Sequence, residues 1–168
     1  MPTKVLALSA EDAEEVFDLR RQALIDSPLA FLASPEDDLA SSVESVRDLL
    51  GRGVNSLLFG ACAARLVGMV GLYRDRHVKA MHKVHLWGMY VRPESRRQGL
   101  GRQLLDATFD HAQRLGGVRS VHLSVSEAAA DAKSLYERAG FQVWGTEPEA
   151  FCYNGQRMRE FHMVLPLM

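Results

Sequence analysis

The stretch Met89–Gly101 constrains this chain more than any other, because it joins a buried strand to a helix through a proline and a glycine-rich basic loop. The residues Val84–Val91 are mostly apolar and predict a buried strand, which Pro93 ends. Apolar residues then recur at helical spacing over about Leu100–Leu115 and predict an amphipathic helix. A strand, a tight loop and a helix N-terminus therefore follow one another directly.

The chemistry of this loop favours an anion. The first amides of a helix lack an acceptor within the helix and lie at the positive end of its dipole. Gly99 and Gly101 allow a ligand to approach the backbone, and three arginines, Arg96, Arg97 and Arg102, add charge, so we expect a phosphate or pyrophosphate here. A P-loop would need lysine and serine or threonine after the second glycine, and a dinucleotide fingerprint would need a third small residue, and neither is present.

The sequence Arg-Arg-Gln-Gly-Leu-Gly at positions 96–101 resembles the Arg/Gln-x-x-Gly-x-Gly/Ala signature of the GNAT acetyltransferases, which follows a strand ending in Val-x-Pro. A second block resembles the strand and helix of the same family, with Leu123–Val125, a Leu-Tyr pair at 135–136 and Gly-Phe at 140–141. Both blocks stand in the family's order and at its spacing, and the resemblance covers nearly the whole chain. The chain departs from the family at Ala129, where GNAT enzymes often have an asparagine.

The resemblance implies a single N-acetyltransferase (GNAT) domain over residues 1–168, of the α/β (α+β) class. The periodicities agree with about seven strands and about four helices, with a crossover joining Val84–Val91 to Val118–Val125. These two strands run parallel if they are neighbours, so we expect a mixed, mostly antiparallel sheet. In the family the two strands splay at the acetyl-CoA site, and Gly88 predicts a bulge in the first of them.

Acetyl-CoA is the co-substrate that the resemblance implies. In the family the loop holds the pyrophosphate, while the backbone of the central strand bonds the pantetheine and polarises the thioester carbonyl. The cofactor-binding residues expected on this basis are Met89, Tyr90, Val91, Arg96, Arg97, Gln98, Gly99, Leu100, Gly101 and Arg102.

Catalysis of amide formation needs a base for the amine and benefits from an acid at the departing thiolate. In the family the amine attacks the thioester directly. Tyr136 occupies the family's acid position, and its alternative is a tyrosine packed in the core. Alignment on Val91-x-Pro93 places His85 where some relatives have a catalytic glutamate, and an imidazole titrates near neutral pH. The alternative for His85 is a structural histidine.

Three residues are expected at the acceptor: Phe31, Trp87 and Glu160. The resemblance places the loop around Phe31 over the acceptor site, Trp87 shares a strand face with His85, and Glu160 lies in a predicted last strand. Core packing of Phe31 and a polar edge-strand position for Glu160 stay open. The acids at positions 36–38 either attract a cationic amine or cap a helix that begins at Ser34, and we expect the cap.

Composition excludes several classes of function. A formal net charge of −1 argues against a general nucleic-acid binder. No apolar run is long enough to span a bilayer and the first residues lack the shape of a signal peptide, so we expect no membrane partner. Cys62 and Cys152 are expected to be reduced core residues of a cytoplasmic protein. We expect no metal, because no cysteine or carboxylate completes a zinc site with His77, His82 and His85.

The sequence therefore predicts an acetyl-CoA-dependent N-acetyltransferase. Its acceptor is a primary amine of a small molecule or an amino group of a peptide or protein, and the choice among these, like a homodimer, stays open. The alternative is a catalytically silent acyl-CoA-binding or sensing domain, which would keep the glycine-rich loop yet need neither Tyr136 nor a base.

Overall fold

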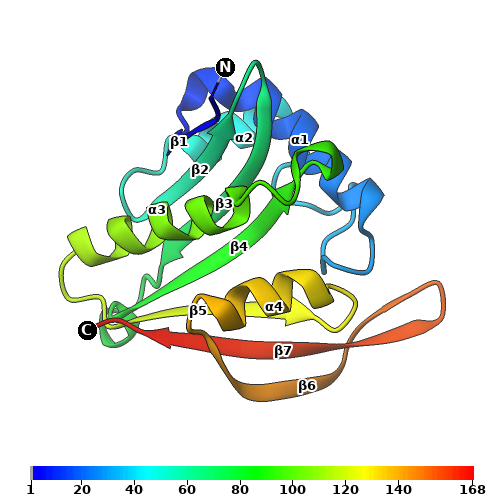
Figure 1. Cartoon of the computed structure of the whole chain (residues 1–168), viewed down its shortest axis with the longest axis vertical. Coiled ribbons are helices and arrows are strands. Elements are labelled where there is room, and N and C mark those ends of the chain that lie inside the picture. Colours follow the sequence, from blue (N-terminus) through cyan, green and yellow to red (C-terminus); the bar gives the residue numbers. More distant parts are fainter. Residues whose placement is uncertain (1) are drawn as a thin grey trace.

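The structure is a computed structural model that describes residues 2–168, in which a seven-stranded mixed sheet carries helices on both faces (Figure 1). The sheet has the order β1-β2-β3-β4-β5-β7-β6. The strands are β1 (Lys4–Ala7), β2 (Ser56–Cys62), β3 (Leu66–Arg74), β4 (Lys83–Val91), β5 (Ser120–Ser126), β6 (Gln142–Tyr153) and β7 (Gln156–Pro166). The helices are α1 (Ala13–Asp26), α2 (Val43–Leu50), α3 (Leu100–Arg114) and α4 (Ala130–Arg138), with short 3₁₀ turns η1 (Ala10–Asp12), η2 (Val78–Ala80) and η3 (Pro93–Ser95).

Strands β4 and β5 form the one parallel pair among the described strands, and every other neighbouring pair is antiparallel. Their ladder covers only three positions, from Lys83 opposite Ser120 to His85 opposite His122. Beyond these residues the strands diverge, as Figure 1 shows. The mixed, mostly antiparallel sheet with splayed central strands is confirmed.

Two hydrophobic cores lie on opposite faces of the sheet because side chains alternate along a strand. The larger core packs under α3 and α4 and includes Val84 and Leu86 of β4. The second core packs under α1 and α2 and includes Tyr90, with Trp87 against it. Strand β4 therefore contributes to both cores and passes through the centre of the molecule. None of the helices in residues 2–168 is long and apolar enough to span a membrane.

The predicted bulge in β4 is confirmed. Met69 pairs with Tyr90 and Gly71 pairs with Trp87, so a step of two residues in β3 faces a step of three in β4. The extra residue falls at Gly88, whose φ of +64° is a conformation that favours glycine. The bulge bends β4 at the point where it has already left β5.

Two expectations are wrong. No helix begins at Ser34, because that segment forms a turn in which the Ser34 amide donates to the Asp37 carboxylate at 2.7 Å. Asp38 turns inward instead and pairs with Arg20, since a buried carboxylate gains more from a charged partner than from a helix end. Cys152 is exposed rather than in the core, although both cysteines are free.

The contact between Gly71 and Trp87 leaves no room for a side chain. A Cβ at position 71 would lie 2.2 Å from the indole nitrogen of Trp87. Gly71→Ala should therefore displace the indole and lower the free energy of unfolding by about 1–3 kcal/mol, the usual cost of overpacking. Gly145→Ala is the matched control, because a Cβ there has nothing within 4 Å. Urea denaturation measures both, and equal stabilities of the two variants would contradict the close contact.

Candidate active site

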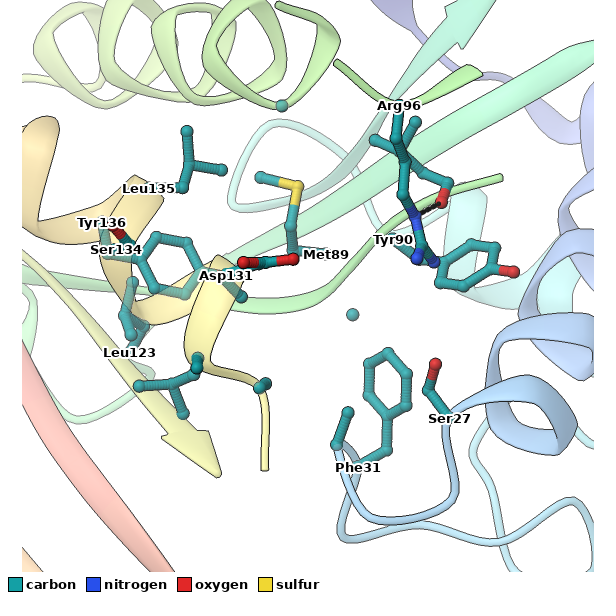
Figure 2. Close-up of a pocket in the computed structure, with 18 of the residues that line it drawn as sticks. Ser27, Phe31, Met89, Tyr90, Arg96, Leu123, Asp131, Ser134, Leu135 and Tyr136 are labelled. Atoms are coloured by element: carbon teal, nitrogen blue, oxygen red, sulfur yellow. Dashed lines mark hydrogen bonds between the residues drawn. The ribbon is translucent and has the colours of Figure 1, made fainter. Parts of the chain in front are cut away.

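A cavity of about 1070 Å³ opens where β4 and β5 part. Figure 2 shows its walls: Ser27 and Phe31 come from the segment after α1, Met89 from β4, Leu123 from β5 and Tyr136 from α4. The lining residues are 26–31, 86–91, 95–97, 99–102, 123–125, 128–132, 134–136 and 138. Segments far apart in the sequence therefore meet around one space.

The loop between β4 and α3 forms one end of this cavity. Arg97 and Gly99 have φ values of +64° and +76°, and Gly99 is the N-cap residue of α3. Backbone that alternates between right- and left-handed conformations at a helix start turns successive N–H groups toward one concave site, which binds anions. Arg96 is held by a 2.8 Å hydrogen bond from its Nε to the carbonyl of Val91 and lies over the Tyr90 ring at 5.6 Å. The geometry suits a phosphate or pyrophosphate.

Nine of the ten residues predicted to bind the cofactor line the cavity, and Gln98 does not. Gln98 is exposed at the outside of the loop. The side chain of Tyr90 also has a second contact, because its hydroxyl donates to the Asp26 carboxylate at 2.9 Å. Burial, followed by that hydrogen bond, raises the pKa of Tyr90 to about 12. Tyr90 thus ties β4 to the end of α1 as well as lining the site.

Tyr136 lies in the wall that α4 forms and is 7% exposed. Its ring packs edge-on against Phe141 at 5.8 Å. Burial raises the pKa of Tyr136 above the ordinary value of a phenol, so the side chain is protonated at neutral pH. Within residues 2–168, burial is the one cause of this shift, and no hydrogen bond to the Tyr136 hydroxyl contributes to it. Ala129, which replaces the frequent family asparagine, also lines the cavity and gives α4 no side-chain cap.

His85 lies apart from the residues that line the cavity. Its ring stacks on Tyr73 at 4.8 Å, and its Nε2 is 3.6 Å from the carboxylate of Asp75. Burial lowers the pKa of His85, although Asp75 opposes that shift. The structure therefore brings His85 together with Asp75 and with His122, at 5.6 Å between rings, and not with Tyr136.

Asp75 is a carboxylate close to His77 and His85, whereas the sequence analysis expected none to complete a zinc site with the histidines. Its Oδ1 is 3.4 Å from Nδ1 of His77, while its Oδ2 faces His85. These contacts are the lengths of weak ion pairs rather than of metal bonds. Within residues 2–168, no group of three or more histidine, cysteine, aspartate or glutamate side chains is arranged to hold a metal ion.

The segment around Phe31 is held in place by a buried arginine that the sequence reasoning missed. Arg20, 6% exposed, forms a two-pronged salt bridge with Asp38, at 3.0 and 2.8 Å. Its guanidinium also lies 5.0 Å from the Phe31 ring and 5.5 Å from the Trp87 ring. A charged residue on the apolar face of a predicted helix was the available signal, because position 20 shares that face with Val16.

A hydrogen bond from β5 also holds the segment around Phe31. The hydroxyl of Ser126, at the buried end of β5, donates to the carbonyl of Leu29 at 2.6 Å. Phe31 and Trp87, both predicted at the acceptor, do line the cavity beside these ties. The segment is thus fixed to α1 by Arg20 and to β5 by Ser126, so its position depends on the whole fold.

Glu160 does not line the cavity but belongs to a polar group beside it. Burial raises the pKa of Glu160, and His162 on the same strand opposes that shift. His162 connects to the cavity through Ser124, whose Oγ lies 2.8 Å from its Nδ1. The other ring nitrogen lies 3.1 Å from Oε2 of Glu147. The sequence reasoning missed Ser124 and Glu147, because strand pairing alone brings them to His162.

Comparisons with known proteins agree with this geometry. The model of the Acetyltransferase (GNAT) family matches residues 15–141. A mycothiol acetyltransferase of Geodermatophilus obscurus is 40% identical over 67 residues, which are 40% of this chain and 21% of that protein, so the chain matches only about a fifth of this curated relative.

Solved structures resemble the whole fold. An acetyltransferase of the GNAT family from Streptococcus pneumoniae has a TM-score of 0.87 at 20% identity, covering 99% of this chain and 100% of that one. A GNAT superfamily phosphinothricin acetyltransferase from Sinorhizobium meliloti, solved in complex with AcCoA, has a TM-score of 0.82 at 19% identity, covering 99% and 89%. At these identities the likeness establishes the fold alone.

The Arg20–Asp38 pair gives a stability prediction. Asp38→Asn would leave the guanidinium charge buried without its counter-charge, so we expect the free energy of unfolding to fall by about 3–5 kcal/mol. Glu94→Gln is the matched control, because it breaks the exposed pair of Arg65 and Glu94, worth about 0–1 kcal/mol. Urea denaturation measures the free energy of unfolding of both variants. Similar decreases in the two would contradict a larger contribution of the buried pair to stability.

Proposed function

The chain belongs to the GNAT family of acetyltransferases, and from this membership we propose that it transfers the acetyl group of acetyl-CoA to a primary amine by direct attack. The observation that carries the proposal is the single cavity that runs from the anion-binding loop at Arg96–Gly101 to Tyr136 and the segment around Phe31. Such a cavity accommodates a long anionic cofactor at one end and an acceptor at the other.

Acetyl-CoA fits the two parts of the site by its chemistry. Its pyrophosphate would lie at the start of α3, near Arg96, Arg97 and Arg102. Its pantetheine would follow β4, where the backbone near Met89 and Val91 lies beyond the three-residue ladder with β5. The Sinorhizobium meliloti enzyme, solved in complex with AcCoA, supports the same ligand for this chain.

Tyr136 would act at the sulfur. A thiol has a lower pKa than a phenol, and burial raises the pKa of Tyr136 further, so full proton transfer to a free thiolate is not strongly driven. Its role is better described as a hydrogen bond donated to the sulfur as charge develops, with proton transfer during or after expulsion.

The acceptor would enter beside Phe31 and Trp87. Both a small primary amine and an amino group of a peptide or protein fit this proposal. The assignment of His85 as the base rests on the resemblance alone and stays a prediction, and its ring lies against Asp75 outside the cavity lining.

Two measurements on the intact chain test the function. Calorimetry with acetyl-CoA tests the cofactor, and release of free CoA thiol with a panel of primary amines and peptide N-termini tests turnover. Binding and turnover together support the enzyme. Binding with no turnover on any amine would favour the catalytically silent acyl-CoA-binding domain.

The loop assignment predicts the effect of a charge at position 99. A Cβ on Gly99 has nothing within 4 Å, so Gly99→Glu would place a carboxylate where the pyrophosphate is expected. We expect CoA affinity to fall at least tenfold, about 1.4 kcal/mol. Gly155→Glu is the control, because this glycine of the β6–β7 turn has a φ of +79° and equal space, far from the loop (Figure 1). Calorimetry should find normal CoA affinity in Gly155→Glu. An equal decrease of CoA affinity in both variants would contradict the assignment of the loop as the pyrophosphate site.

The role of Tyr136 predicts a selective loss of rate. Tyr136→Phe keeps the ring and removes the hydroxyl, so we expect turnover to fall about ten- to several hundredfold, or about 1.4–3.5 kcal/mol. Acetyl-CoA affinity and melting temperature should change little. Tyr153→Phe, in the exposed end of β6, should retain the normal rate. If Tyr136→Phe has the normal rate while acetyl transfer is rate-limiting, the tyrosine is only a packing residue.

A further inference from the structure

We propose that Ser124, His162 and Glu147 form a proton relay that accepts the proton of the acceptor amine, with Ser124 as the catalytic residue in contact with the amine. His162 acts through Ser124, and Glu147 positions His162. The inference rests on the proposed acetyl transfer and supplies the base that this reaction needs.

Ser124 is the member of this group that lines the cavity. It lies in β5 between Leu123 and Val125, and all three line the space where β4 and β5 part. Successive residues of a strand point to opposite faces, so the exposed Ser124 lies opposite its buried neighbours, on the face away from α4. The segment around Phe31, where the acceptor would enter, is attached to the same strand two residues later, at Ser126.

Strand pairing holds the relay together. Ser124 and His162 are directly paired residues of β5 and β7, and Ser124 Oγ lies 2.8 Å from His162 Nδ1. Strand β6 supplies Glu147, whose Oε2 lies 3.1 Å from His162 Nε2, and the Trp144 ring lies 5.4 Å from the imidazole. In a serine, a histidine and a carboxylate arranged in this order, the carboxylate orients the imidazole so that its other nitrogen can take a proton from the serine.

The charged groups around His162 are few. Glu147 faces it from β6, and Glu160 lies two residues away on its own strand. On β5, the next titratable residue of the same face is His122, whose Nε2 bonds Ser120 at 2.9 Å. Lys133 of α4 lies over the ring of Phe161, on the other face of the sheet.

The imidazole of His162 carries its proton on Nε2, which donates to Glu147, and its Nδ1 accepts from Ser124. One N–H bond of the acceptor ammonium breaks, its proton passes to Ser124 Oγ, and the serine proton passes to Nδ1. The amine lone pair then attacks the thioester carbon, the C–N bond forms, the C–S bond breaks, and a second N–H proton balances the thiolate as thiol.

The end of the relay at Glu147 is exposed to solvent. The side chain of Glu147 is 53% exposed and that of His162 is 27% exposed, so the extra proton leaves to solvent from this end. His85, by contrast, is not in the cavity lining. Its side chain contacts Tyr73, Asp75 and His122, and none of these lines the cavity. The geometry therefore favours the Ser124 relay over His85 as the base.

The first test needs no acceptor. With ¹⁵N-labelled histidine in the intact chain bound to CoA, the ring nitrogens of His162 should show a neutral form protonated on Nε2. Ser124→Ala should shift the Nδ1 resonance, and Glu147→Gln should shift that of Nε2. A neutral His162 protonated on Nδ1 would overturn the relay, because that nitrogen then cannot accept a proton from Ser124.

The second test follows kcat against pH with the amine that the panel shows to react fastest, under conditions where acetyl transfer limits the rate. The normal protein should lose rate as pH falls and the relay becomes protonated. His162→Gln should lower kcat about a hundredfold and move this acidic limb to higher pH, because without the relay only amine that is already unprotonated reacts. Ser124→Ala should act similarly, Ser124→Thr should retain most of the rate, and the double variant should be no worse than either single one.

Controls separate the outcomes. His77→Gln, with a side chain 91% exposed, should keep the normal rate and profile. Melting temperatures identify variants that do not fold. If His162→Gln does not fold, the pH dependence of kcat is measured on Glu147→Gln instead. An acidic limb that keeps its normal position in the folded relay variant, or that moves to higher pH in His85→Ala, overturns the relay. Acetyl-CoA binding with no amine acetylated would instead show that the proposed function itself has failed.

Discussion

The divergence of β4 from β5 creates the space around which the chain is organised. Their ladder stops at His85 and His122, and any backbone N–H or C=O left unpaired in a closed site costs about 1–3 kcal/mol. The bulge at Gly88 bends the freed strand at this point. The space left by the missing ladder is part of the single cavity that joins the α3 loop to the segment around Phe31, and an extended ligand that hydrogen-bonds to the backbone would suit it.

The part of the cavity around Phe31 is held in place by an ion pair and by contacts with aromatic rings rather than by regular secondary structure. Arg20 joins Asp38, Phe31 and Trp87, although these residues come from α1, from the segment before α2 and from β4. Its remaining nitrogen, Nη1, has no hydrogen-bond partner in residues 2–168 and would lie 3.4 Å from a Cβ at Gly88. A buried guanidinium of this kind couples the stability of the fold to the position of the segment around Phe31.

The two ends of the cavity differ in their chemistry. The end at α3 is cationic and has glycine backbone, which suits phosphate oxygens. The other end is beside the carboxylates of Glu147 and Glu160, with His162 between the strands, which suits a group that arrives as an ammonium and must lose protons. Tyr136 lies in the α4 wall of the same cavity. The cationic loop and the carboxylates therefore lie at different parts of the site.

The sequence by itself determined the strand, loop and helix around Gly99 and the bulge at Gly88, because periodicity, proline and glycine act over a few residues. The mixed sheet was expected from the family resemblance and from the crossover between the two central strands. The tertiary structure alone decided which polar side chains meet. Asp38 pairs with Arg20 rather than capping a helix, and His162 meets Ser124 and Glu147, because the burial of a helix and the register of β5, β6 and β7 set those distances. Local patterns carry no information on contacts that only long-range strand pairing and packing create.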